Sequence, residues 1–266
     1  MIECKHKHPK VLLSFDVEEF DMPREHGGTI SVEEGVEVSA EGVEKILDLL
    51  KRTAVLATFF VTGNFAERAP ELVRRMVAEG HEVACHGVDH FRPKASDLVE
   101  SKRIVEKVAG VKVRGYRQPR MFKTDYGEMH RCGYAYDSSV NPAWVPGRYN
   151  NTGVSRRPFV REGVVEVPTS VATGARVPMF WLALHWMPVL AYVKLARGCL
   201  RQTGYFATYF HPWEFATAVL KYKMVPGYVR HNAGDKMVKR LERVIRGLEG
   251  EFVTYSDFVE RWQNEK

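Results

Sequence analysis

Two histidines with a four-residue spacing, His86 and His90, are the first candidates for metal chemistry in this sequence. On a helical turn this spacing puts both imidazoles on one face, where they can bind one ion from the same side. Such a pair is weak evidence alone, because many are surface or capping residues. Asp16 or Glu18 could supply a third, oxygen ligand. A set of two histidines and one carboxylate, with an open position for water, is typical of catalytic zinc sites.

The elements that must position these residues alternate between short β-rich runs and amphipathic helices. Continuous apolar runs predict buried strands, and apolar residues at helical spacing predict helices. The predicted strands are residues 11–15, 55–61, 81–85, 113–116, 134–136, 164–168 and 205–210, with a candidate closing strand at 252–255. The predicted helices include residues 39–51, 70–80, 96–109 and 235–248.

This alternation predicts a mostly parallel sheet covered by helices. No GxGxxG motif or P-loop follows the first strand, which counts against a nucleotide-binding sheet. A length of 266 residues is normal for one α/β barrel, and no repeat, low-complexity stretch or linker divides the chain. We therefore predict one domain over residues 1–266, folded as a closed or nearly closed β/α barrel.

Seven ionisable residues follow predicted strands. In a parallel barrel the carboxyl ends of all strands meet at one mouth, where active sites are built. Residues from distant parts of the chain are therefore expected to converge on one cleft. They are Asp16, Glu18, His86, His90, Arg117, Asp137 and His211.

The sequence blocks around these residues resemble a known family. SFDVEEF, HGVDH, RGYRQP, YDSS and YFHPWEF occur in the order seen in the polysaccharide deacetylase family, the nodulation-protein-B homology domain of family-4 carbohydrate esterases. The blocks extend from Asp16 to His211. The resemblance implies a distorted (β/α)7 barrel, which agrees with the strand count reached independently.

The resemblance also implies a role for each matching residue. It makes Asp16 the general base, oriented by Arg117, and His211 the general acid. The remaining matches are Asp137, which resembles the acidic partner of that histidine, and the metal ligands His86 and His90.

The opening motif departs from the common family pattern of two adjacent aspartates, because Val17 follows Asp16. A branch with an Asp-x-acid opening looks closer, and in it the ligand is the acid two positions on, here Glu18. Residues i and i+2 of an extended segment face the same side, which supports Glu18. Glu19 is then the weaker candidate, and Asp16 stays the alternative ligand.

These residues predict a metal-dependent hydrolase that cleaves a carbon–nitrogen bond. The first hypothesis is removal of an N-acetyl or N-formyl group from an amino sugar in a glycan or lipid-linked precursor, with Trp213 lining the substrate cleft. The second is an allantoinase-like cyclic amide or imide hydrolase, and the third is a non-catalytic carbohydrate-binding barrel. The expected ion is zinc, although cobalt, nickel, manganese and iron suit the same ligands.

Composition bears on partners and location. The net charge is +6, but no nucleic-acid motif or charge block is present, so we expect no nucleic-acid partner. Four scattered cysteines without a CxxC pair, and a polar start, predict a cytoplasmic protein. The apolar segment 177–200 is interrupted by charge and proline, which predicts a buried helix; peripheral membrane contact is the alternative. The oligomeric state has no signature in the sequence.

Overall fold

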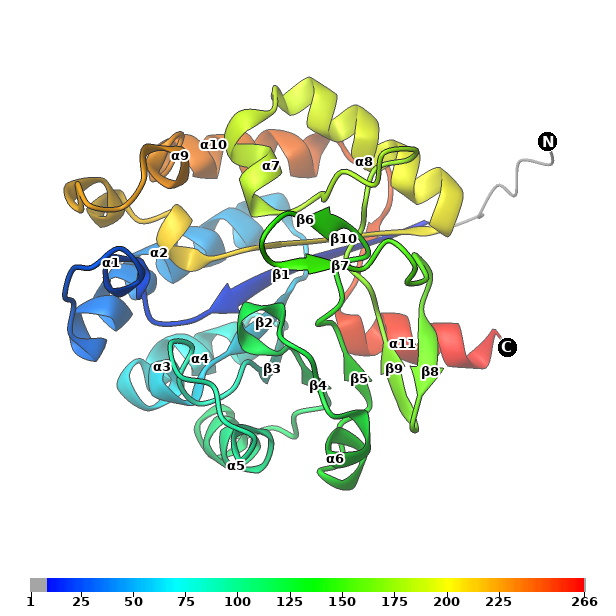
Figure 1. The fold of residues 1–266 in the computed structure, drawn as a ribbon, viewed down its shortest axis with the longest axis horizontal. Helices are drawn as coiled ribbons and strands as arrows, with labels where there is room; N and C mark the ends of the chain where they lie inside the picture. Colours follow the sequence, from blue (N-terminus) through cyan, green and yellow to red (C-terminus); the bar gives the residue numbers. More distant parts are fainter. Residues whose placement is uncertain (1–8, 266) are drawn as a thin grey trace.

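The computed structural model describes residues 9–265, and these form a curled α/β sheet surrounded by helices (Figure 1). Seven strands are parallel, in the order β10-β1-β2-β3-β4-β5-β9, and β8 pairs antiparallel with β9 at the edge. Their bounds are β1 Lys10–Val17, β2 Thr58–Val61, β3 Glu82–Cys85, β4 Gly115–Tyr116, β5 Tyr136–Asp137, β8 Phe159–Arg161, β9 Val164–Glu166 and β10 Tyr205–Phe210. The predicted distorted (β/α)7 barrel is confirmed.

The barrel is nearly closed where the chain leaving β9 meets β10. Ser170 donates its backbone N–H to the Ala207 carbonyl oxygen at 2.9 Å, and its hydroxyl accepts from the Ala207 N–H at 2.9 Å. The Tyr205 hydroxyl donates to the Pro168 carbonyl at 2.8 Å. These bonds replace the strand pairing that would complete the ladder.

Local sequence signals mark the starts of two of the larger helices. The hydroxyl of Ser31 caps α2 by accepting from the Glu34 N–H at 3.0 Å, and Pro70 is the first residue of α4. The larger helices are α2 Val32–Thr53, α4 Pro70–Ala78, α5 Asp97–Ala109, α8 Val189–Thr203, α10 Asp235–Gly247 and α11 Tyr255–Asn264. Shorter ones are α1 Met22–Glu25, α3 Gly63–Arg68, α6 Tyr126–Arg131, α7 Trp181–Trp186, α9 Gly227–Arg230 and the 3-10 turns η1 Pro119–Met121, η2 Pro212–Glu214 and η3 Thr217–Lys221.

Side-chain alternation along the strands produces two hydrophobic cores. Val11, Leu13, Phe15 and Val17 of β1 belong to the large core between sheet and helices. Leu12 belongs to a smaller core inside the barrel, together with residues of β2, β3, β5, β9, β10 and α11. Polar side chains at inward-facing positions near the strand ends therefore point toward the barrel mouth.

The C-terminal segment covers the opposite end of the barrel. The predicted closing strand is short: β11 Glu251–Phe252 pairs in parallel with the first residues of β1. In α11, the Tyr255 N–H donates to the Thr58 hydroxyl and the Ser256 N–H donates to Glu82, both at 3.0 Å. Because Thr58 and Glu82 begin β2 and β3, α11 closes the amino end of the barrel.

The apolar segment 177–200 forms two helices, α7 and α8, separated at Met187 and Pro188. One face of α8 is buried, while Leu190 is 77% exposed and Trp186, at the end of α7, is 55% exposed. Among residues 9–265, no helix is long and apolar enough to cross a membrane. The three described cysteines are free thiols, and Cys4 lies outside the described residues.

A short hairpin lies over the barrel mouth near the site. It consists of β6 Trp144–Val145 and β7 Tyr149–Asn150, which pair antiparallel with each other and, within residues 9–265, with no other strand.

Candidate active site

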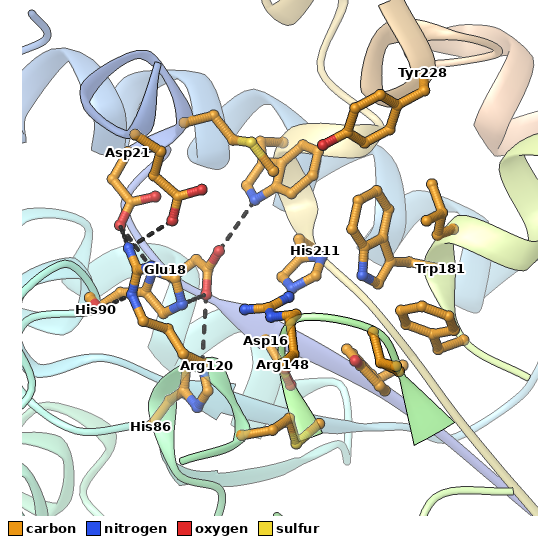
Figure 2. A pocket seen from close by; sticks show the side chains of 18 of the residues that line it. Asp16, Glu18, Asp21, His86, His90, Arg120, Arg148, Trp181, His211 and Tyr228 are labelled. Atoms are coloured by element: carbon orange, nitrogen blue, oxygen red, sulfur yellow. Dashed lines mark hydrogen bonds and ion pairs between the residues drawn. The ribbon is translucent and has the colours of Figure 1, made fainter. Parts of the chain in front are cut away.

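A cleft of about 460 Å³ opens at the carboxyl ends of the strands (Figure 2). Most of the residues predicted for the site line it: Asp16, Glu18, His86, His90, His211 and Trp213. Arg117 lies below the cleft and reaches it through Asp16, whereas Asp137 does not line it.

The end of β1 supplies the two acids. Phe15 and Val17 pack into the large core between sheet and helices. Ser14, Asp16 and Glu18 therefore occupy the alternate, inward-facing positions. Asp16 and Glu18 are each only 3% exposed. Glu19 faces away from the cleft, where the Thr62 hydroxyl and the Asn64 amide donate to it, each at 2.7 Å. Both carboxylate oxygens of Glu19 therefore have hydrogen-bond donors within the fold.

His86 and His90 come from the loop that follows β3, not from a helix. The expected helical turn is wrong because Gly87, between them, has a left-handed backbone with φ of 71°. The loop still brings the imidazoles together, with ring centroids 5.7 Å apart and planes 24° from parallel. Cys85, the residue before His86, points into the large core between sheet and helices.

Hydrogen bonds to Nδ1 orient both imidazoles. His86 Nδ1 lies 2.8 Å from the Arg117 carbonyl oxygen, and His90 Nδ1 lies 2.8 Å from Asp21 Oδ2. Both partners accept, so each Nδ1 carries the hydrogen and the neutral ring has its lone pair on Nε2. Metal-binding histidines are oriented in this way.

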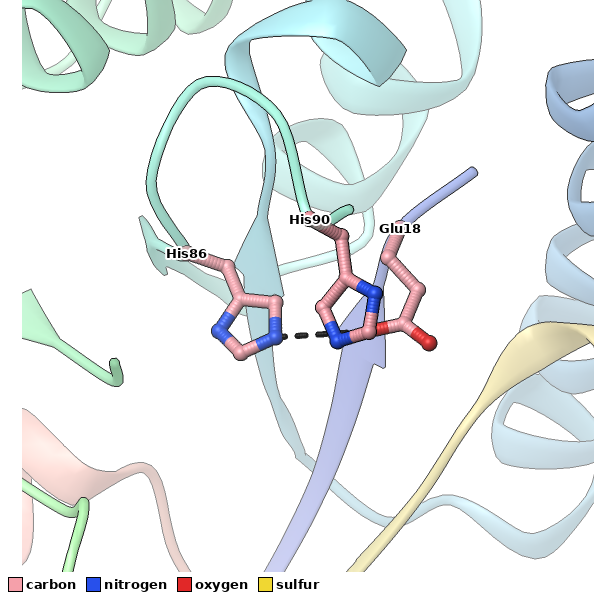
Figure 3. A group of neighbouring side chains, drawn as sticks. All are labelled: Glu18, His86 and His90. Carbon is pink, nitrogen blue, oxygen red and sulfur yellow. Dashed lines mark ion pairs between the residues drawn. The ribbon is translucent and has the colours of Figure 1, made fainter. Parts of the chain in front are cut away.

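Glu18 meets the two free nitrogens (Figure 3). Its Oε2 lies 3.4 Å from His86 Nε2 and 3.0 Å from His90 Nε2. This oxygen is buried and has no hydrogen-bond donor of good geometry. The three atoms lie within 4.8 Å of one another. Three acceptors that converge without a donor fit a bound cation.

The charges around Glu18 keep it ionised. Burial raises its pKa, but His90, His211 and His86 outweigh that effect and bring the pKa to about 2. Burial lowers the pKa of His90, while Glu18 and Asp21 raise it to about 9. A proton on His90 and a metal ion are therefore alternative ways to balance these carboxylates.

Arg117 fills the inside of the barrel beneath Asp16. All five of its N–H groups are used, and its guanidinium carbon lies 4.0 Å from the ring centroid of Phe60. The acceptors are Ser138 O at 2.9 Å, Ser14 Oγ at 3.0 Å, Ser138 Oγ at 3.0 Å, the Tyr255 hydroxyl at 3.1 Å and Asp16 Oδ1. One oxygen of Asp16 is thereby fixed and the carboxylate is held at the cleft.

His211 follows β10 and is held by Glu214, three residues on in η2. Its Nδ1 lies 3.0 Å from Glu214 Oε1, which also accepts the His211 backbone N–H. The η2 turn packs closely on α2, because a Cβ at Gly42 would lie 1.8 Å from the Pro212 carbonyl oxygen. Burial lowers the pKa of His211, but Glu18 and Glu214 raise it further than burial lowers it.

Glu214 is fully buried and has a second histidine partner. His185 Nε2 lies 2.9 Å from Glu214 Oε2, and His185 Nδ1 donates to the His231 carbonyl oxygen. A carbonyl can only accept, so the hydrogen of His185 Nδ1 points to His231. No pattern in the sequence assigns His185 a role, and the structure places it behind the acid that holds His211.

The prediction that Asp137 partners His211 is wrong. Tyr136 points into the barrel core, so its neighbour Asp137 points outward. Asp137 accepts hydrogen bonds from Ser139 Oγ at 2.5 Å and Thr124 Oγ1 at 3.0 Å. Glu214 takes the position that Asp137 was expected to hold.

Trp213 links the metal centre to His211. Its indole N–H donates to Glu18 Oε1 at 3.2 Å, and its ring stacks on His211 with centroids 4.9 Å apart. The ring of Trp181 packs edge-on against His211 with centroids 5.4 Å apart. Two indoles therefore enclose the imidazole and limit its contact with water.

Asp21 and Glu214 are site residues that the sequence analysis missed. Asp21 lies three residues after Glu18, and Glu214 lies three residues after His211 within the quoted block YFHPWEF. The spacing from a candidate residue was therefore a usable signal for both. Their contacts depend on turns that no strand or helix pattern predicts.

Comparison with known proteins identifies the family. Residues 5–136 match the family model described as polysaccharide deacetylase. These residues therefore form a polysaccharide deacetylase domain. A relative from Bacillus subtilis, peptidoglycan-N-acetylmuramic acid deacetylase PdaA, is 36% identical over 100 residues, which are 34% of this chain and 38% of that protein. The first curated relatives are matched over only 17% to 38% of their own lengths.

Solved structures of the polysaccharide deacetylase type share the fold over nearly the whole chain. A probable polysaccharide deacetylase from Pseudomonas aeruginosa superposes with a TM-score of 0.66 at 16% identity, covering 96% of this chain and 91% of that one. Puue allantoinase superposes with a TM-score of 0.62 at 17% identity, covering 96% and 90%. Both show the same barrel, so the fold alone does not separate deacetylation from cyclic amide opening.

Proposed function

We propose that this polysaccharide deacetylase family member is a metal-dependent hydrolase that removes an N-acetyl or N-formyl group from an amino sugar. The observation that carries the proposal is the convergence of His86 Nε2, His90 Nε2 and Glu18 Oε2 in one cleft with Asp16 and His211. Cation ligands, a base and an acid together are what amide hydrolysis requires.

The proposed ligands are Glu18, His86 and His90. Two imidazoles and one carboxylate suit zinc, and cobalt, nickel, manganese and iron are the other candidates. A divalent ion held there would supply Lewis acidity toward the amide carbonyl and make a water molecule more acidic.

Asp16 is the proposed general base. The Arg117 guanidinium binds one of its oxygens, and the same residue lines the cleft. An ionised carboxylate in this position accepts the proton of the attacking water molecule. Arg117 acts through Asp16: it binds one carboxylate oxygen and keeps the carboxylate directed at the cleft.

His211 is the proposed general acid. Glu214 holds its Nδ1–H, so Nε2 is the nitrogen available to the substrate. A protonated Nε2 donates its proton to the amine that leaves when the carbon–nitrogen bond breaks. The negative charge of Glu214 favours the imidazolium form that this step needs, as the raised pKa of His211 indicates.

The substrate class rests on the relatives and on the shape of the cleft. The name of the Bacillus subtilis relative specifies a peptidoglycan sugar that carries an N-acetyl group. Aromatic side chains at the cleft, Trp181, Trp213 and Tyr228, suit the apolar face of a sugar ring, and the role of Trp213 in substrate binding stays a prediction. A cytoplasmic location and peripheral membrane contact through the segment 177–200 also stay predictions.

A second candidate is opening of a cyclic amide. The likeness to Puue allantoinase favours it, because that protein has the same fold and allantoin hydrolysis also breaks a carbon–nitrogen bond in an amide. The cleft offers the same base, acid and ligands to either substrate.

Metal analysis of the purified protein tests the site. We expect about one divalent ion per chain in the wild type and its loss in His86→Ala and His90→Ala. His130→Ala is the matched control, because His130 is exposed and lies outside the cleft. Equal metal content in all four proteins would remove the metal centre from the proposal.

Two substrates then separate the reactions. Acetate release from N-acetylglucosamine oligomers supports deacetylation, whereas ring opening of allantoin supports the second candidate. His211→Ala is expected to keep its metal and to lose roughly 10²- to 10⁴-fold in kcat, the usual contribution of a general acid. Sugar binding without turnover of either substrate would favour the non-catalytic barrel.

A further inference from the structure

The cleft contains one cation that no carboxylate neutralises. Four carboxylates line it, and each has a basic partner among the described residues. The ion pairs are Asp16 with Arg117, Glu18 with His86 and His90, Asp21 with His90 and Arg120, and Glu25 with Arg120. Of the two arginines that line the cleft, Arg120 is therefore used by the protein itself.

Arg148 is the other arginine, and within residues 9–265 its guanidinium has no hydrogen bond or ion pair to a side chain. Figure 2 shows it at the centre of the cleft, among Glu18, Asp16 and His211. An arginine is always charged, and a cation kept beside reacting groups without a partner is available to a ligand.

The hairpin β6–β7 aims Arg148 at the cleft. Its backbone N–H donates to the Val145 carbonyl at 3.0 Å, which closes a four-residue turn. Pro146 and Gly147 are the central residues, and Gly147 has φ of 76°, as a type II turn requires. Val145, Arg148 and Tyr149 all line the cleft, so this turn forms part of its wall.

The remaining wall shows where such a ligand would lie. Phe180, Trp181 and Leu182 line the cleft without adding charge, and His211 packs against Trp181. A substrate whose amide reaches His211 and Glu18 therefore meets apolar side chains and the single unpaired guanidinium. An anionic substituent has one favourable place in this cleft, beside Arg148.

We propose that Arg148 binds a carboxylate or phosphate group on the acylated sugar, so that the preferred substrate is a sugar acid or a sugar phosphate. This inference rests on the proposed function, because it names the substrate class of the same site. Guanidinium groups bind both anions through paired N–H donors. Arg148 then determines specificity and takes no part in proton transfer.

Three small amides test the proposal with metal-loaded protein. N-acetylglucosamine is neutral, N-acetylmuramic acid adds a carboxylate, and N-acetylglucosamine 1-phosphate adds a phosphate. We expect at least one anionic amide to have the higher kcat/KM, and which one distinguishes a carboxylate from a phosphate ligand. In Arg148→Gln its KM should rise about 10- to 100-fold, as expected for loss of a charge-assisted hydrogen bond, with kcat little changed.

Controls make the result specific to this arginine. Arg148→Lys should recover part of the preference, because it restores the charge but not the paired donors. Arg243→Ala is the matched control, since Arg243 is exposed on α10 and lies outside the cleft. Arg243→Ala should hydrolyse all three amides as the wild type does.

The outcomes separate this inference from the proposed function. Deacetylation with no preference for an anionic sugar, or a preference that Arg148→Gln retains, would overturn the role of Arg148 alone. If no amide is hydrolysed, the proposed function fails. Calorimetric binding of the two anionic sugars then tests whether Arg148 forms an anion site. Weaker binding by Arg148→Gln than by Arg243→Ala would then support an anion site, and equal binding would overturn it.

Discussion

Two pairs of buried acids lie at the same end of the barrel, and only one pair faces the cleft. Asp16 and Glu18 continue the inward-facing positions of β1. Asp137 and Glu166 are register partners on β5 and β9, but their neighbours point into the barrel core, so these acids point outward. All four are at strand ends. The face of the strand therefore separates an acid that can do chemistry from one that supports the fold.

The partners of the two pairs differ accordingly. Glu18 has one oxygen without a donor, facing two imidazole nitrogens. Glu166 instead accepts from the Tyr126 hydroxyl at 3.0 Å and from the Val140 N–H at 3.0 Å. Burial and the neighbouring Asp137 raise the pKa of Glu166 well above its usual value. One pair is arranged for a cation, and the other holds a proton.

The largest effect is expected at Glu214, the acid that holds His211. The comparison is Asp137, the acid first predicted to hold it. Glu214→Gln should lower kcat about 100-fold, because the neutral amide no longer favours the His211 imidazolium. Asp137→Asn should leave kcat unchanged, since Asp137 is outside the cleft. Steady-state kinetics with metal content measured in parallel checks both. A large loss of kcat in Asp137→Asn at full metal content would break the comparison.

A smaller effect is expected at Asp21, which orients the Nδ1–H of His90. Asp21→Asn should weaken metal binding about 10- to 100-fold, as changes behind a metal ligand typically do. Competition with a chelator of known affinity measures this change. Asp48→Asn, which removes the charge of an exposed residue paired with Arg75, is the control and should bind metal as the wild type does. Unchanged affinity in Asp21→Asn would mean that Asp21 does not orient the ligand.

The smallest effect concerns the proton held by Asp137 and Glu166. Because the pKa of Glu166 is raised, the folded protein keeps a proton that the unfolded chain releases near pH 4.5. Its contribution to stability is therefore present at acid pH and falls as the pH rises above about 4.5. Glu166→Gln should lose less stability than the wild type between mildly acidic and mildly basic pH. Thermal melts across that range, with exposed Glu71→Gln as the control, check the difference in slope.

The general fold was predictable from the sequence because strand and helix patterns repeat regularly. All seven parallel strands form where apolar runs occur, although β4 and β5 are shorter than predicted. The helix predicted at residues 39–51 belongs to the longer α2, whose first turns carry fewer apolar residues. The nearly closed seam was also expected. The bonds of Ser170 that complete it were not, because they join segments without a strand pattern.

The site was predictable where a residue directly follows a predicted strand and faces inward. Asp16, His86 and His211 meet both conditions. Asp137 meets only the first, and alternation from Tyr136 was a signal in the sequence that could have excluded it. Arg148 and Asp21 lie in turns, where position depends on tertiary contacts that a single sequence does not reveal.

Arg117 donates hydrogen bonds to both Asp16 and the Tyr255 hydroxyl, so the residues that hold Asp16 in place are synthesised at different times. Residues of β1, β2 and β3 leave the ribosome early, but Tyr255 and the strand β11 follow more than a hundred residues after Arg117. Until they emerge, the guanidinium lacks one of its five acceptors and the amino end of the barrel stays uncovered. A nascent chain can therefore form most of the sheet and still lack a fixed base, so hydrolytic activity is expected only after Tyr255 has been made.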